Sequence, residues 1–282
     1  MTMLNHSSFN PASPSTNLLQ AVISIVVETS AAIMQIYGRE FAVEHKPDAS
    51  PLTEADQQAH RLITQRLQAL TPDIPVLSEE SPAEHQTFAV RSQWPTLWLV
   101  DPLDGTREFI NRNGEFTVNI ALIHEHHPVL GIVAVPATQT IYTGAVGLGA
   151  QRIDSLGTAS IQTQRPARPA PIVVGSRSHR GDSLDAVLAR LGSHELCSVG
   201  SALKFCRVAE GAADFYPRLG PTSEWDTAAG QAVLEAAGGQ VIGLDGAPLR
   251  YNQRETLLNP HFLAYGDTAV NWLSFVAPTA PA

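Results

Sequence analysis

Residues 97–106 read Leu-Trp-Leu-Val-Asp-Pro-Leu-Asp-Gly-Thr, and this stretch carries the strongest structural signal in the chain. Its first four residues are apolar, which is typical of a short strand that is buried on both faces. The strand is expected to end at Asp101, where Pro102 removes a backbone donor and fixes the bend. Gly105 then permits a positive φ or a close approach of the backbone. Asp101 and Asp104 are therefore predicted to lie together where the chain leaves its sheet.

Two carboxylates held this close repel each other unless a cation lies between them. Oxygen ligands suit magnesium or manganese rather than zinc. Two further acidic clusters, Glu79-Glu80 and Glu224-Trp225-Asp226, follow a predicted strand and begin a predicted helix, respectively. Each pattern alone has an ordinary explanation as a turn, a solvated surface or a helix cap. Together they supply enough carboxylates for a two-metal site, and Thr106 beside them can orient a metal-held water as a nucleophile.

The composition indicates a packed globular protein with a small ligand. The chain has 282 residues, of which 44% are hydrophobic and 16% charged, and this length suits two closely packed subdomains. A net charge of −9 without a basic run argues against nucleic acid as a partner, whereas a bound metal can still attract a small phosphorylated ligand. The cysteines, Cys197 and Cys206, form neither a disulfide framework nor a zinc pattern. They are expected to be buried reduced thiols, which fits a cytosolic protein.

The N-terminal region predicts a disordered lead-in followed by two helices. Residues 1–17 are rich in Ser, Asn and Pro and lack the order of a signal peptide. Residues 18–37 place apolar side chains at helical spacing behind Asn17 as an N-cap, and polar interruptions favour a buried amphipathic helix over a membrane span. No transmembrane segment is therefore expected. Residues 53–70 predict a second helix, with Thr53 as its N-cap and Asp56 at its third position.

The rest of the chain alternates between strand and helix patterns without a strict βαβ order, which predicts an α/β protein of layered sheets and helices. Residues 151–171 are rich in Thr, Ser, Arg and Pro and are expected to carry the crossover into the second half of the chain. The histidines of residues 124–127 are interpreted as a solvated loop rather than as metal ligands. The remaining predicted strands are 75–78, 97–100, 117–123, 131–135, 139–144 and 172–174, and the remaining helices are 183–191, 201–210 and 226–237.

The three acidic clusters resemble the signatures of the inositol monophosphatase superfamily. These are residues 78–81, 101–106 and 225–230, in the family's order, and the resemblance covers about residues 18–265. It implies an α+β layered fold, the αβαβα sandwich of that family. It also implies an N-terminal subdomain over residues 18–160 with most metal ligands, and a C-terminal α/β subdomain over residues 161–282 with the substrate pocket and the last ligand.

Longer stretches resemble the CysQ-type 3′(2′),5′-bisphosphate nucleotidases within that superfamily. They are residues 99–123, 176–179, 200–206 and 216–218. The resemblance implies a lithium-sensitive, magnesium-dependent enzyme that converts adenosine 3′,5′-bisphosphate, a by-product of sulfate assimilation, to AMP and phosphate. Two or three Mg²⁺ per site are implied, with Mn²⁺ as an alternative. A monomer or homodimer in the cytoplasm is expected, either free or associated peripherally with the inner face of the cell membrane.

Carried over by position, the resemblance assigns a role to each site residue. Glu79, Thr106 and Asp56 would be the catalytic residues, with Glu79 and Thr106 orienting the attacking water and Asp56 hydrogen-bonding Thr106 or a metal-bound water. The metal ligands would be Glu79, Asp101, Asp104, Asp226 and the backbone carbonyl of Leu103. The substrate contacts would be Leu103, Asp104, Gly105, Thr106, Ser176, Arg177, His179, Gly200, Ser201, Lys204, Arg218 and Asp226.

Substrate choice stays open at this stage. Inositol phosphatases carry an acidic residue before the Trp-Asp motif, whereas this chain has Arg218 there, and a cation suits a second phosphate. One alternative is a phosphatase of the same superfamily that acts on inositol monophosphate or a sugar bisphosphate. The other is a non-catalytic sensor of metal and nucleotide, against which the intact pair of Glu79 and Thr106 counts.

Overall fold

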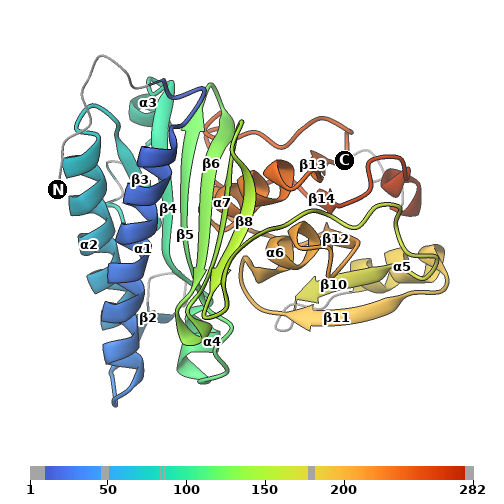
Figure 1. Ribbon diagram of the computed structural model, residues 1–282, viewed down its shortest axis with the longest axis horizontal. Helices are drawn as coiled ribbons and strands as arrows, with labels where there is room; N and C mark the ends of the chain where they lie inside the picture. The colour runs from blue at the N-terminus through green and yellow to red at the C-terminus, as the bar shows by residue number, and fades with distance from the viewer. Residues whose placement is uncertain (1–9, 46–50, 83, 85–86, 177–181, 277–282) are drawn as a thin grey trace.

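Five layers of helices and sheets build the protein, whose computed structural model describes residues 10–45, 51–82, 84, 87–176 and 182–276. Figure 1 shows α1 and α2 on one outer face, then a seven-stranded sheet, then α6 and α7, then a five-stranded sheet with α5 on the other outer face. This order of layers confirms the predicted αβαβα sandwich. Arg177 and His179, two of the expected substrate contacts, lie outside the described residues, as does most of the predicted lead-in.

The helices α1 (Thr16–Tyr37) and α2 (Glu54–Leu70) cover the outer face of the larger sheet. The expected cap of α1 is wrong, because Ser15, not Asn17, has extended backbone and accepts a hydrogen bond from Leu18 N at 3.2 Å. Thr53 caps α2 as predicted, directly after a two-stranded ribbon of β1 (Val43–His45) and β2 (Pro51–Thr53). Among the described helices, only α1 is long and apolar enough to span a membrane, but its apolar side packs against the sheet as in a core helix.

The larger sheet has the strand order β3-β4-β5-β6-β7-β8-β9. β3 runs parallel to β4, and every later neighbour is antiparallel. β4 does not stop at Asp101 as expected, but continues to Asp104 through a register shift against β5. Both aspartates therefore project from one strand end. The strands are β3 (Val76–Ser78), β4 (Thr96–Asp104), β5 (Thr117–His124), β6 (His127–Val135), β7 (Thr140–Ala145), β8 (Gly149–Asp154) and β9 (Gly157–Ser160).

Two sequence interpretations in this sheet need correction. The crossover expected over residues 151–171 begins only after Ser160, because residues 149–160 form β8 and β9. An edge strand such as β9 is exposed throughout and needs no apolar face. The histidine run is not simply a solvated loop. Glu125 and His126 form a two-residue hairpin turn with φ values of 46° and 67°, and His126 Nδ1 lies 2.9 Å from the carbonyl oxygen of Tyr251.

The smaller sheet has the strand order β11-β10-β12-β14-β13, with β10 parallel to both of its neighbours. Two helices begin away from their predicted starts, since α6 begins at Leu203 rather than Ser201 and α7 begins two residues before Asp226. The elements are β10 (Ile172–Ser176), α5 (Asp182–Leu191), β11 (Glu195–Val199), α6 (Leu203–Ala209), β12 (Phe215–Arg218), α7 (Glu224–Ala236), β13 (Gln240–Gly243) and β14 (Phe262–Tyr265). Short helices lie at α3 (Phe88–Arg91), α4 (Thr106–Ile110), η3 (Pro136–Thr138) and η4 (Trp272–Phe275).

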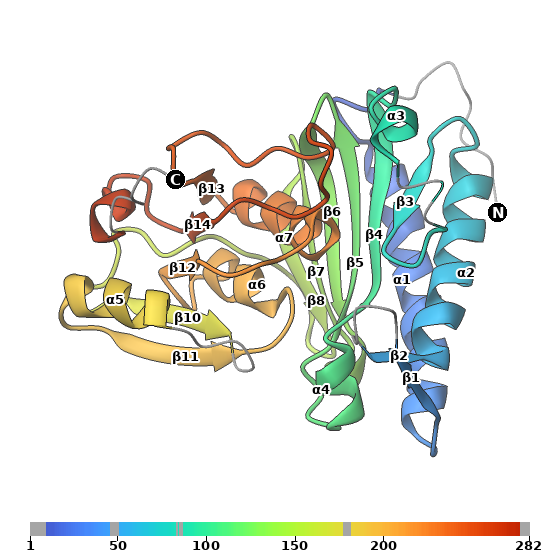
Figure 2. The same ribbon diagram turned by 180° about the vertical axis from the view of Figure 1, so that it is seen from behind.

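Helix α7 lies between the two sheets and packs very closely on the larger one. A Cβ added to Gly144 of β7 would lie 2.5 Å from the Cα of Val233 in α7, so only glycine allows this approach. The contact holds α7 against the larger sheet (Figure 2), and the first turn of α7 brings Asp226 into the same cleft as Asp104 at the end of β4. The proposed boundary near residue 160 stays a prediction, because α6 and α7 belong to the later half but share a core with β4, β5 and β6.

Candidate active site

A cleft of about 280 Å³ opens where the end of β4 meets α4, β12 and the first turn of α7. Nine of the residues predicted from the sequence line it, while Asp56, Asp101 and Leu103 are buried and not among the lining residues. Ser176 ends β10, and its contact with a substrate stays a prediction. The nine are Glu79, Asp104, Gly105, Thr106, Gly200, Ser201, Lys204, Arg218 and Asp226.

The acidic side chains of this cleft repel one another. Burial, followed by the charges of Glu79, Asp104 and Asp226, raises the pKa of Asp101 well above its ordinary value. Burial and the charge of Asp104 raise the pKa of Asp226 in the same way. Burial also raises the pKa of Asp104 to about 6, although the Lys204 ammonium opposes this shift. The protein has therefore gathered more negative charge than its own cations compensate, and a divalent cation would relieve that repulsion.

The donor set fits magnesium better than a metal that needs a closed protein cage. Within the described part of the chain, no three His, Cys, Asp or Glu side chains form a ready-made metal cage. Magnesium usually keeps several waters and binds through one or two carboxylates together with substrate phosphate oxygens. An open arrangement of buried carboxylates at one end of a cleft matches this habit, whereas structural zinc requires four protein ligands.

The carboxylate of Asp104 is oriented by polar neighbours from both halves of the chain. Asn119 donates from Nδ2 to Asp104 Oδ2 at 3.3 Å, and Thr117 donates to the same oxygen at 3.5 Å. The backbone N–H of Ala202 also donates to this carboxylate. These donors favour the ionised form of Asp104, which is the form that a cation would need.

The turn after Asp104 depends on a contact between the two halves. Gly105 has φ 89°, and a Cβ there would lie 2.2 Å from Ser201 Oγ, so no other residue fits. Ser201 Oγ lies 2.9 Å from the carbonyl oxygen of Asp104 and 2.7 Å from that of Glu115. Gly200 N donates to Glu115 Oε2 at 2.9 Å. Ser201 thus uses its hydroxyl hydrogen on the backbone, and a substrate contact through it stays a prediction.

Asp56 reaches Thr106, as expected, but it does so with a fully occupied carboxylate. Its Oδ2 accepts from the backbone N and the hydroxyl of Thr53 at 2.7 and 2.6 Å. Its Oδ1 accepts from Thr106 Oγ1 at 3.1 Å. Burial raises the pKa of Asp56, while these hydrogen bonds oppose the shift. With its proton directed at Asp56, Thr106 keeps its oxygen lone pairs for a water in the cleft.

Two cations, Lys204 and Arg218, also line the cleft. Lys204 is buried, its Nζ donates to the carbonyl oxygen of Ser201 at 2.6 Å, and burial lowers its pKa to about 8 against the attraction of Asp104. Arg218 donates from Nη2 to the carbonyl oxygen of Pro221 at 2.6 Å. The Nε of Arg218 is buried without a protein partner, which leaves a donor for an anionic group.

Some cleft residues carried no separate sequence signal. Glu108 lies only two residues after Thr106 in the acidic motif, yet it reads as an ordinary polar residue of a short helix. The aromatic wall comes from Phe205 and Tyr216, whose rings pack edge to face at 5.2 Å. Both lie in stretches that resemble CysQ, residues 200–206 and 216–218, but their own residue types are those of a core helix and strand and gave no separate reason to assign them to the site.

Residues 15–270 match the family model described as the inositol monophosphatase family. The chain belongs to this family. Among curated members, it is 50% identical to the 3′(2′),5′-bisphosphate nucleotidase CysQ of Salmonella typhimurium over 247 residues, which are 87% of this chain and 98% of that protein. It is 39% identical to the Haemophilus influenzae protein of the same name, over 92% of this chain and 96% of that one.

Solved structures agree with this membership. CysQ from Bacteroides thetaiotaomicron, described as a bacterial member of the inositol monophosphatase family, matches with a TM-score of 0.77 at 41% identity. The match covers 88% of this chain and 96% of that chain. An IMPase from Thermotoga maritima matches with a TM-score of 0.76 at 23% identity, over 92% and 96% of the two chains, and shows the shared fold alone.

Proposed function

We propose that this inositol monophosphatase family member is a 3′(2′),5′-bisphosphate nucleotidase that converts adenosine 3′,5′-bisphosphate to AMP and phosphate. The observation that carries the proposal is the 50% identity to a nucleotidase of that name over 87% of the chain. The cleft is compatible with this substrate, because it is lined both by carboxylates and by the cations Lys204 and Arg218.

The two cations favour a bisphosphate over a neutral polyol phosphate. A single phosphate would lie at the carboxylate side, where bound metal offsets its charge. A second phosphate would gain charge-assisted hydrogen bonds from the free Nε of Arg218 and from the Lys204 ammonium. Gly105 and Thr106, whose backbone borders the cleft at the start of α4, would face the phosphate that is cleaved.

The metal ligands would be Glu79, Asp101, Asp104, Asp226 and the carbonyl oxygen of Leu103, holding two or three Mg²⁺, with Mn²⁺ as an alternative. Bound magnesium would lower the pKa of the attacking water and offset the charge that develops on the leaving oxygen. Asp101 is preset for this role, because its Oδ1 accepts from Leu103 N at 3.0 Å and its side chain is buried.

The chain's own residues would orient the reaction. Thr106 and Glu79 would accept hydrogen bonds from the attacking water, and Asp56 would keep the Thr106 hydroxyl in the accepting orientation. Attack at phosphorus opposite the ribose 3′-oxygen breaks the bond to that oxygen, so most of the rate would come from positioning and charge neutralisation. The enzyme would act in the cytoplasm, either free or peripheral to the inner membrane face, as a monomer or homodimer.

The test is phosphate release from three substrates, each with magnesium and with EDTA. Adenosine 3′,5′-bisphosphate should be hydrolysed much faster than inositol 1-phosphate or fructose 1,6-bisphosphate, and EDTA should abolish the activity. A preference for the inositol or sugar phosphate would overturn the assignment of Arg218 and Lys204. No release from any substrate would favour the non-catalytic sensor.

A further inference from the structure

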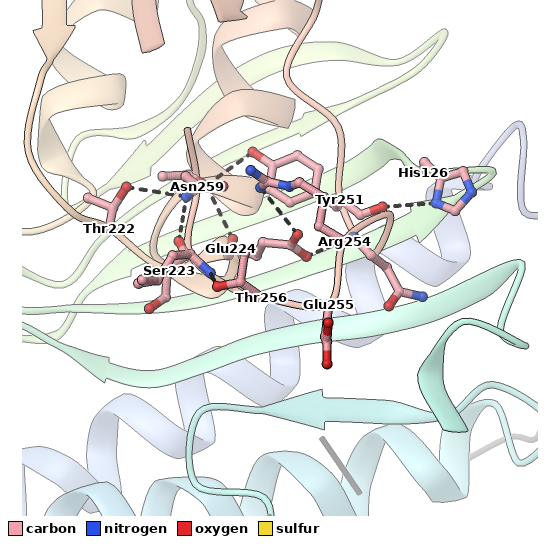
Figure 3. A network of polar contacts seen from close by, with 12 residues as sticks. His126, Thr222, Ser223, Glu224, Tyr251, Arg254, Glu255, Thr256 and Asn259 are labelled. Atoms are coloured by element: carbon pink, nitrogen blue, oxygen red, sulfur yellow. Dashed lines mark hydrogen bonds and ion pairs between the residues drawn. The ribbon is translucent and has the colours of Figure 1, made fainter. Parts of the chain in front are cut away.

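A buried polar network joins the two sheets around the first turn of α7, and it contacts the cleft-lining residues Thr222 and Thr227. Its centre is the segment 251–259, here called the strap, which follows β13 and runs beside the first turn of α7. Figure 3 shows Glu224 beside Arg254 of the strap, and Asn259 reaching Thr222 and Ser223. None of these strap residues lines the cleft.

One end of the strap is fixed to the earlier half of the chain by Arg91, the last residue of α3. Arg91 is completely buried. Its Nη1 donates to Asn252 Oδ1 at 2.9 Å, and its Nη2 donates to the carbonyl oxygens of Arg254 and Glu255 at 2.8 and 2.6 Å. Asn252 returns a hydrogen bond from Nδ2 to the carbonyl oxygen of Arg91 at 2.7 Å. A reciprocal pair of this kind fixes both distance and orientation.

The hairpin between β5 and β6 provides a second attachment on the same side. Tyr251 N donates to the carbonyl oxygen of His126 at 3.1 Å, and His126 Nδ1 lies 2.9 Å from the carbonyl oxygen of Tyr251. Figure 3 shows His126 at this end of the network. The strap is therefore held to the earlier half of the chain at two points, α3 and the hairpin between β5 and β6.

The other side of the strap holds the start of α7. Asn252 N donates to Glu224 Oε2 at 2.7 Å, and Glu224 is completely buried. Arg254 Nη2 lies 3.7 Å from Glu224 Oε1. Asn259 Nδ2 donates to the carbonyl oxygen of Ser223 at 2.7 Å, and Glu224 N donates to the carbonyl oxygen of Leu257 at 2.8 Å. The residues immediately before Asp226 thus receive their partners from the strap.

We propose that Arg91, Asn252 and Glu224 form a latch that positions the first turn of α7, and so holds Asp226 toward the carboxylates at the end of β4. The inference rests on the proposed function, in which Asp226 is a metal ligand. The three are positioning residues, since they act through the backbone of α7. A buried arginine and a buried glutamate are costly to hold unless their partners are well placed, so the arrangement is a specific one.

The experiment is a calorimetric titration of the metal-free, full-length protein with Mg²⁺, well below the unfolding temperature. The main variant is Asn252→Gly, which tolerates the φ of 55° at this position and keeps the backbone donor to Glu224. It removes both side-chain bonds to Arg91. We expect magnesium affinity to fall about tenfold, the scale seen when partners that orient metal ligands are removed.

Three further variants separate positioning from stability. Arg91→Met removes the latch from its other end and should give the same loss. Asn252→Asp keeps the oxygen that accepts from Arg91 and should restore most of the affinity. The matched control is Asp214→Asn, because Asp214 is equally buried and is paired with Arg168 Nη1 at 2.8 Å in the smaller sheet, outside the cleft lining. It should lower the melting temperature without weakening magnesium binding.

Wild-type magnesium affinity in both Asn252→Gly and Arg91→Met would overturn the latch and leave the proposed function intact. An equal loss of magnesium affinity in Asp214→Asn would also overturn it, because a general loss of stability would then explain the effect. If the wild-type protein bound no magnesium, the metal site of the proposed function would fail and the latch with it. In turnover assays the latch variants should need more magnesium for half-maximal rate, with an unchanged KM for the nucleotide at saturating magnesium.

Discussion

Asp56 and Asp226 occupy the same position in two different helices, and their surroundings give them different chemistry. Each is the third residue of its helix, α2 or α7, and each accepts a hydrogen bond from the backbone N of the residue that caps the helix. The distances are alike, 2.7 Å from Thr53 N to Asp56 and 2.8 Å from Ser223 N to Asp226. Local helix capping therefore treats the two aspartates as equivalent.

Their remaining contacts differ. Asp56 receives two further hydroxyl donors, from Thr53 and Thr106, so both of its oxygens are occupied by the protein. Asp226 instead faces Asp104 and Glu79, whose negative charges add to burial in raising its pKa. A carboxylate whose oxygens are occupied can orient a neighbour, whereas one surrounded by like charge is suited to a cation. The comparison distinguishes the aspartate proposed to position Thr106 from the aspartate proposed to bind metal, although both begin their helices in the same way.

The largest effect is expected at Asp226. Asp226→Asn keeps an oxygen for the helix cap but removes the charge, and we expect turnover to fall about a thousandfold, since metal-assisted charge stabilisation is worth several kcal/mol. Phosphate release from the nucleotide measures this. Asp101→Asn, which changes no helix cap, should lower turnover by as much, while its circular dichroism spectrum should stay that of the wild type. Wild-type rates in either variant would refute the metal-site assignment.

Asp56→Asn should lower turnover less than Asp226→Asn does. The expected loss is about a hundredfold, the upper end of the range for residues that orient an active group. The reason is that Thr106 loses its carboxylate acceptor, while the metal ligands stay in place. Adding Thr106→Ala to Asp56→Asn should cost little more than the more damaging single change, because the two side chains act as a unit. Fully additive losses in turnover would show that they act separately.

The variant Arg218→Met tests whether the later half of the chain, besides providing Asp226, also binds the second phosphate of the substrate. We expect KM for adenosine 3′,5′-bisphosphate to rise about tenfold, the value of one charge-assisted hydrogen bond, with little change for adenosine 3′-monophosphate. The same rise for both nucleotides would place Arg218 away from the second phosphate.

Thr53→Ala should have the smallest effect. Removing this N-cap hydroxyl, which accepts from Ala55 N at 3.2 Å, should lower the free energy of unfolding by about 1 kcal/mol. Urea denaturation measures the change, and Thr53→Ser serves as the control because it keeps the hydroxyl. Equal stabilities of the alanine and serine variants would show that the cap does not depend on this group.

Much of this comparison could be predicted from the sequence, because it depends on short-range patterns. Thr53 followed by Asp56 is a capping signature, and an apolar strand ending in two aspartates predicts an acidic cluster. The prediction of Asn17 as the N-cap of α1 was wrong because Ser15 and Asn17 are both residues that favour this position, and packing decides between them. β8 and the edge strand β9 were missed because polar, solvent-exposed strands lack the apolar alternation that reveals buried ones.

The long-range contacts could not be predicted. Arg91 and Asn252 are 161 residues apart, and each reads alone as an ordinary surface residue. Ser201 carries a signal in its motif, but nothing in the sequence shows that its hydroxyl would reach the carbonyl oxygen of Asp104. Such contacts follow from how the two sheets stack, which a single sequence does not specify locally.

The measurement that tests the account most directly is calorimetric magnesium binding to Asp226→Asn and Asp56→Asn, side by side with the wild type. If Asp226 is a ligand and Asp56 orients Thr106, the first variant should bind magnesium at least about tenfold more weakly. The second should bind it as the wild type does. Equal affinities in the two variants, or a greater loss at Asp56, would contradict the distinction on which the proposed mechanism rests.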